Sequence, residues 1–134
     1  MAKEVKTFIG PKELEDFLVV HGLSNPGAAI GVLFVFFDLV AVRQPESRWV
    51  LVEDLVAAFL QTFDGFYVNV KGEPLKGERA AMKVRQVIQG LTAGRRALEN
   101  RGGRLFASVA LLRRFPQLDS GRESKILPPP VRFR

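Results

Sequence analysis

The side chains best suited to chemistry in this sequence are those of arginine and lysine, and they gather in its second half. Residues 1–70 contain five Lys/Arg and nine Asp/Glu, a balance of −4, whereas residues 71–134 contain fifteen Lys/Arg and five Asp/Glu, a balance of +10. Such an excess of cations is typical of proteins that bind the phosphate backbone of nucleic acids, because each cation at a phosphate releases condensed counterions. A solvated basic surface is the alternative, so the arrangement of the charges has to decide.

The sequence offers little to catalysis. His21 is the only histidine, and at the end of an apolar helical stripe it is better explained by packing or capping than by acid–base chemistry. The acidic pairs Glu15-Asp16 and Glu53-Asp54 stand where helix N-termini favour negative charge. The chain contains no cysteine and no glycine-rich phosphate loop of the Walker or dinucleotide type. We therefore expect a protein that is not an enzyme and that holds no metal or cofactor.

One group of cations falls on an expected helix at residues 78–91. Its apolar residues recur on one side of the helix, as they do in a helix packed against a core. Another side carries Arg79, Lys83 and Gln86, and Lys76 stands just before the helix. The positive N-terminus of the helix adds to the attraction for phosphate.

A second group belongs to an expected hairpin, with strands at residues 95–99 and 105–111 joined by a turn at residues 100–104. The glycines of the turn allow positive φ and a close approach of the backbone. The ordinary explanation is a solvated turn whose arginines keep a sheet edge soluble. Because the neighbouring helix is also basic, we favour a nucleic-acid contact. Its residues would be Arg95, Arg96, Arg101 and Arg104, extended by Arg113 and Arg114.

The remaining elements are those needed to position the helix and the hairpin. Helices are expected at residues 11–22, 26–42 and 53–63, and a short strand at residues 49–52. The apolar segment 26–42 has no polar face, so a buried strand competes with a central helix, and part of it is a candidate subunit interface. The order helix, strand, helix, helix, strand, turn and strand is that of a winged helix, a helix-turn-helix variant with a β-hairpin after its second helix.

We accordingly expect a mainly α protein with a small β-hairpin, of the α+β class, built as a winged helix-turn-helix with extra N-terminal helices. Residues 1–10 would be an N-terminal arm and residues 11–114 a single domain. Residues 115–134 contain four prolines and few hydrophobic residues. Such a composition predicts an extended or disordered tail rich in Pro and Arg.

Three stretches of this region, VLVEDLVAAFLQTF, KVRQVIQGLTAG and RRALENRGGRLFASVALL, carry a family resemblance. They resemble the winged-helix domain near the C-terminus of phage, plasmid and large-virus primase-helicases, over roughly residues 49–112. The resemblance implies nucleic-acid binding and no catalysis, since no primase or helicase motif is present. The connector at residues 64–77 is long for a tight helix-turn-helix, and residues 66–70 within it could add a strand. The residues implied are Arg79, Lys83, Arg95, Arg96, Arg101 and Arg104.

Three functions remain open. The one we favour is a small DNA-binding regulator or replication accessory factor that dimerises through residues 26–42. The second is a regulatory factor that binds protein, such as a phage or plasmid factor that docks on a polymerase. The third is an RNA-binding protein, with Phe66 and Tyr67 stacking on unpaired bases. The N-terminus lacks the apolar core of a signal peptide, and Asp38 interrupts the longest apolar run, so we expect an intracellular protein, cytoplasmic or nuclear, without membrane contact.

Overall fold

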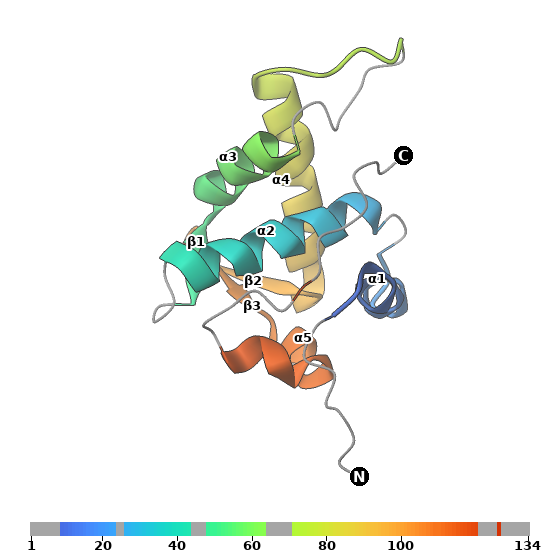
Figure 1. Cartoon of the computed structure of the whole chain (residues 1–134), viewed down its shortest axis with the longest axis vertical. Coiled ribbons are helices and arrows are strands. Elements are labelled where there is room, and N and C mark those ends of the chain that lie inside the picture. Colours follow the sequence, from blue (N-terminus) through green and yellow to red (C-terminus); the bar gives the residue numbers. More distant parts are fainter. Residues whose placement is uncertain (1–8, 24–25, 44–47, 64–70, 121–125, 127–134) are drawn as a thin grey trace.

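The described part of the chain is mainly helical and carries one small antiparallel sheet (Figure 1). The computed structural model describes residues 9–23, 26–43, 48–63, 71–120 and 126. This arrangement confirms the expected α+β class. The elements in chain order are α1 (Pro11–Val20), α2 (Gly27–Arg43), β1 (Trp49–Leu51), α3 (Val52–Thr62), α4 (Glu78–Thr92), the 3-10 helix η1 (Ala93–Arg95), β2 (Leu98–Arg101), β3 (Arg104–Ala107), α5 (Val109–Arg114) and the 3-10 helix η2 (Pro116–Ser120).

The apolar segment forms α2, the central helix, which contacts α1, α3, α4 and β1 (Figure 1). A helix rather than a strand forms here, and its 17 residues place apolar side chains on nearly every side. Of residues 26–42, only Asp38 and Val42 are exposed. The dimer expected through this segment finds little apolar surface there, because most of the apolar side chains are buried against the chain's own elements.

The sheet has the strand order β1-β3-β2, with both pairs of strands antiparallel. Its inner face packs against the helices through Val50, Leu98 and Leu105, which are buried. The hairpin is shorter than expected and displaced along the chain, because β2 begins at Leu98 and β3 ends at Ala107. The second strand stops there because the Ser108 side chain accepts a hydrogen bond from the Leu111 backbone N–H at 3.0 Å and so caps α5.

The core extends past both boundaries that we expected for the domain. Ile9 and Ile126 form an isolated parallel β-bridge, and both side chains are buried. Phe115 and Leu118 are also buried, on either side of the first residues of η2. The stretch that begins at residue 115 is therefore not wholly an extended tail, because its few large apolar side chains find places on the core.

Several sequence expectations are met closely. The structure has α1, α3 and α4 within two residues of their expected bounds, and β1 within one. The possible strand at residues 66–70, with Phe66 and Tyr67, lies outside the described residues. Among the helices that the structure describes, none is long and apolar enough to cross a membrane.

Candidate nucleic-acid interface

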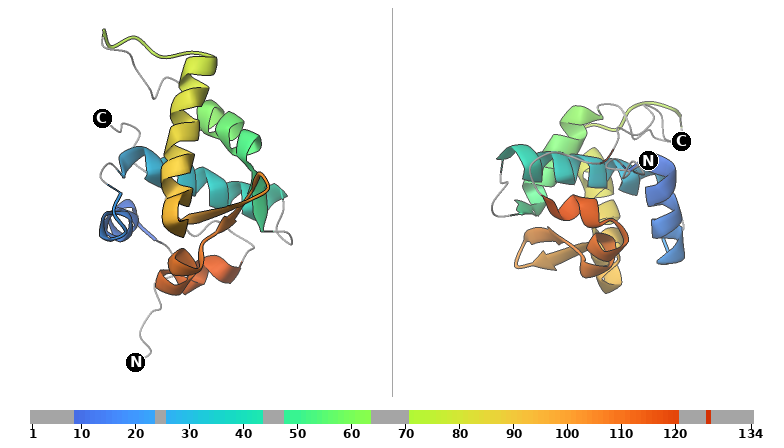
Figure 2. Two further views of the ribbon diagram at one scale, coloured as in Figure 1. Left: turned by 180° about the vertical axis from the view of Figure 1, so that it is seen from behind. Right: turned by 60° about the horizontal axis from the view of Figure 1, so that its bottom comes forward.

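Helix α4 lies on the surface of the molecule with one side buried and the other open to solvent (Figure 2, left). The buried side packs on α2 and α3 through Ala80, Ala81, Val84, Ile88 and Leu91. The opposite side is exposed along the helix, as its sequence pattern predicted. We define the α4 face by the exposed side chains of Arg79, Lys83 and Gln86, with exposed Met82 between them.

The cations of the α4 face are free of acidic partners among the described residues. The ion pairs that link described residues involve neither Arg79 nor Lys83. Lys76, in the turn just before the helix, is exposed as well. Cations without carboxylate partners keep their full attraction for an external anion, so this face is suited to phosphate.

Arg85, on the flank of α4, makes contacts that the sequence did not reveal. Its guanidinium donates to both carboxylate oxygens of Glu53 on α3, at 3.0 and 2.7 Å, and also to Glu78. These hydrogen bonds lower the pKa of Glu53 and raise that of Arg85. The pair fixes α4 against the start of α3, so Glu53 does more than supply negative charge to a helix terminus.

The hairpin turn consists of Gly102 and Gly103, between the paired residues Arg101 and Arg104. Both glycines have positive φ, 62° and 89°, which is the requirement of a two-residue type I′ turn. The Gly103 N–H donates to the Asn100 side-chain oxygen at 2.8 Å. The Gly103 carbonyl accepts from the first N–H of α3 at 3.1 Å. The turn is therefore held to the body of the protein.

The register of the strands puts six side chains on the side of the sheet away from the core. Residues directly opposite each other in antiparallel strands share a face. Trp49 and Glu99 both lie opposite Phe106, and Leu51 and Arg101 both lie opposite Arg104. We call this the outer sheet face. Its members are Trp49, Leu51, Glu99, Arg101, Arg104 and Phe106.

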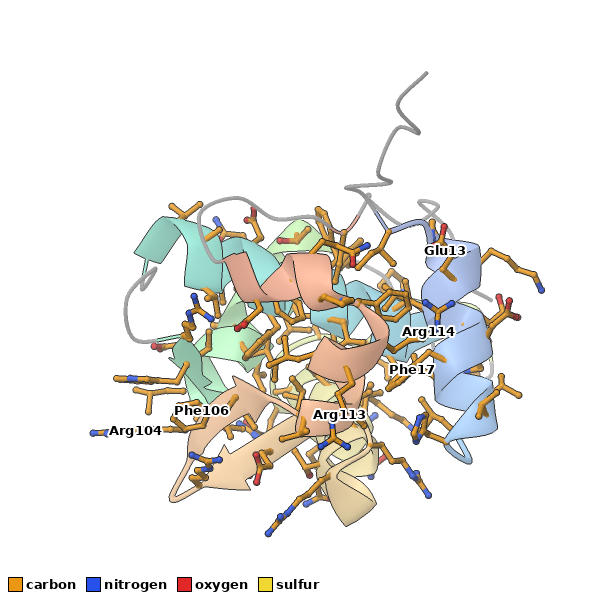
Figure 3. All side chains as sticks on the ribbon, turned by 90° about the horizontal axis from the view of Figure 1, so that it is seen from below. Glu13, Phe17, Arg104, Phe106, Arg113 and Arg114 are labelled. Atoms are coloured by element: carbon orange, nitrogen blue, oxygen red, sulfur yellow. The ribbon has the colours of Figure 1, made fainter. Side chains whose placement is uncertain are left out.

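Both arginines of the outer sheet face lie over aromatic rings. The Arg104 guanidinium is 4.6 Å from the ring centre of Trp49, and that of Arg101 is 4.8 Å from the ring centre of Phe106. Figure 3 shows Arg104 pointing away from the body of the protein beside Phe106. Arg101 also donates to Glu99 at 3.1 Å, whereas no described acid pairs with Arg104.

Arg95 and Arg96 do not begin a strand, contrary to our expectation. They form the joint between α4 and the hairpin, where the backbone turns through η1. The Arg96 guanidinium donates to the Gly90 carbonyl at 3.3 Å, and the Ala97 N–H donates to the Leu91 carbonyl at 3.0 Å. Arg95 pairs with Glu99 at 3.4 Å. These contacts assign Arg96 to the positioning of the hairpin.

Arg113 and Arg114 lie on α5, whose residues 109–111 we had expected at the end of a strand. Both are exposed. Arg114 lies over the Phe115 ring at 4.6 Å and is near α1, whose Phe17 contacts the same ring (Figure 3). Arg114 therefore lies toward α1 and not along the hairpin that it was expected to extend. The other cations form two groups, on α4 and on the sheet.

An apolar cavity of about 130 Å³ adjoins the outer sheet face at Phe106. Its walls come from α2, β3, α5 and η2, and Arg48 and Asp119 form an ion pair among its lining residues. A cavity of roughly 150 Å³ with apolar walls can hold a benzene molecule. No cluster of three or more metal-ligating side chains occurs in the described ranges.

No family model, curated protein or solved structure matches the chain. What the surface binds therefore has to be inferred from its own charges and geometry.

Proposed function

We propose that the protein binds nucleic acid, duplex DNA in the first place, and acts as a small regulator or replication accessory factor with a winged-helix architecture. Support comes from the element order, in which a helix, a strand, two helices and a hairpin follow one another as α2, β1, α3, α4 and β2–β3. The pairing of β1 with β3 joins the hairpin to the rest of the domain. In such an architecture α4 is the helix that enters the major groove.

The observation that carries the proposal is the α4 face. On this exposed helix side Arg79 and Lys83 have no acidic partner among the described residues, and Gln86 follows one turn further on. The face thus offers two cations to phosphates and an amide to base edges. A Gln amide can form two hydrogen bonds with adenine in the major groove. The apolar Met82 between them is 52% exposed and suits contact with a thymine methyl group.

The hairpin supplies the second contact. Arg101 and Arg104 flank its glycine turn and are exposed, so they can lie along the phosphate backbone beside the groove that α4 occupies. The Arg85–Glu53 pair and the joint at Arg96 hold both elements in place. Elements that are already in place before binding lose less conformational entropy on binding, which favours affinity.

The test is fluorescence anisotropy of a labelled DNA duplex at low and at raised salt. We expect binding whose affinity falls steeply with salt. The double variant Arg101→Glu, Arg104→Glu should weaken it strongly, and circular dichroism should show an intact fold, because both side chains are exposed. A matched control is Lys12→Glu on α1, whose cation is already paired with Asp16 at 3.3 Å.

Two results would overturn the proposal. The first is the absence of duplex binding at low salt, and the second is binding that does not depend on salt. A protein partner that survives nuclease treatment and is lost in the Arg79→Glu variant would assign the α4 face to a protein-binding regulator instead. Competition between duplex DNA, single-stranded DNA and RNA ranks the nucleic acids.

A further inference from the structure

We infer that the outer sheet face is a second site, separate from the α4 face, which binds unpaired nucleotides by stacking. The inference rests on the proposed function only in assuming that the natural ligand is a nucleic acid. A protein with both sites would recognise a duplex that ends in a single strand or carries an opened segment.

The first argument is geometric. The register pairs Trp49 with Phe106 and brings Arg101 and Arg104 directly opposite each other. Each guanidinium lies over an aromatic ring, so two flat cation–ring layers stand on one side of the sheet. Single-strand binding proteins hold successive bases by stacking them on aromatic rings and on arginine planes.

The second argument is that large apolar side chains of the outer sheet face are exposed to solvent. Leu51, on the edge strand β1, is 42% exposed, and Trp49 and Phe106 are each partly exposed. Aromatic side chains of this size dominate interfaces, since they bring large contact areas with few rotatable bonds. The described elements leave them open, which indicates a binding surface.

The third argument is charge. The face carries two arginines and one acid, and Glu99 pairs with Arg101, so the cation without a described acidic partner is that of Arg104. An Arg104 guanidinium that stacks on Trp49 still has its N–H groups free to donate at the edge of the plane to a phosphate. The combination of π-faces and a cation fits a single strand better than an apolar protein surface.

Trp49 makes the test direct, because it is the only tryptophan of the chain and belongs to the proposed site. The probe is oligothymidylate of about ten nucleotides, within the size range bound by small single-strand sites. We expect saturable quenching of tryptophan fluorescence as the oligonucleotide is added. Binding seen by anisotropy without quenching, or no binding at all, would overturn the inference.

The variants separate stacking from charge. Phe106→Leu should weaken oligonucleotide binding by about fivefold or more, the loss expected when one base loses its aromatic partner. Phe106→Tyr retains the ring and should bind as the unmodified protein does. Arg104→Lys keeps the charge but not the plane, so it should weaken single-strand binding while changing duplex binding little. If Arg104→Lys lost affinity equally for the single strand and for the duplex, that result would contradict stacking.

The same measurements distinguish this inference from the proposed function. Unchanged quenching by oligothymidylate in an Arg79→Ala, Lys83→Ala variant whose duplex binding is weakened would support two separate sites. If the single strand quenches the fluorescence but the unmodified protein binds no duplex, only the proposed function would be overturned. Duplex binding with no quenching by the single strand would overturn the second site alone. Because Phe106 lines the apolar cavity, thermal unfolding has to confirm that each variant is folded.

Discussion

Replacing Arg79 and Lys83 by alanine removes two exposed cations from α4 and leaves its packing intact. Both side chains point away from the core, and neither pairs with a described acid. Alanine favours helix more than either residue does, so the helix should persist. The variant thus isolates the electrostatic contribution of the α4 face from the stability of the protein.

The size of the effect follows from counterion release. If Lys76, Arg79, Lys83, Arg101 and Arg104 each neutralise one phosphate, the logarithm of the binding constant should fall with the logarithm of salt with a slope of about −4.5. A fourfold rise in salt then weakens binding about 500-fold. Without Arg79 and Lys83 the slope should be about −2.7, and the same rise should weaken binding about 40-fold.

The assay is anisotropy of a labelled duplex over a series of salt concentrations. Each single variant, Arg79→Ala or Lys83→Ala, should change the slope by about 0.9, and the double variant by about twice that. Lys12→Ala, on α1, should leave the slope unchanged. An unaltered slope in the double variant would refute the reasoning, because it would show that the α4 face does not contact phosphate.

Three further predictions concern the elements that hold the interface. Gly103→Ala should lower stability by about 1–2 kcal/mol in thermal unfolding, because alanine resists positive φ. A Cβ there meets no atom within 4 Å, so the cost is that of the backbone conformation. Gly103→Asn should cost less, because Asn adopts positive φ more readily. Ser108→Ala should cost about 1 kcal/mol in urea unfolding, since it removes the cap of α5. The lowered pKa of Glu53 means that its pair with Arg85 stabilises the fold above the ordinary value of 4.5. The unmodified protein should therefore have a higher free energy of unfolding than Glu53→Gln near neutral pH, and this difference should disappear as the pH falls through the lowered pKa of Glu53.

The helices of the candidate interface could be predicted from sequence because their signals are local. In α4 the apolar and polar residues alternate with helical period, and burial follows that pattern from Ala80 to Leu91. The choice between helix and strand for residues 26–42 could not be made in this way. A segment that is apolar on all sides has no period, so only tertiary packing decides it.

The errors at the hairpin have a physical explanation. Gly94 and Arg95 both adopt positive φ, at 60° and 56°, so the chain turns where a strand was expected. The β-prone residues after Ala107 form α5 because Ser108 caps a helix there. The clustering of Arg101 and Arg104 over Trp49 and Phe106 depends on strand register, which no local signal in the sequence specifies.

The joint at Arg96 sets the distance between the cations of α4 and those of the hairpin. Its hydrogen bonds tie the end of α4 to the base of β2, and the Ser108 N–H ties β3 to the same segment through the Ala97 carbonyl at 2.9 Å. If the protein binds nucleic acid as proposed, cations held by this joint would meet only those phosphates whose spacing matches theirs. One residue inserted at Ala93 would leave every contact side chain present and still put the two sets out of step with a regular duplex.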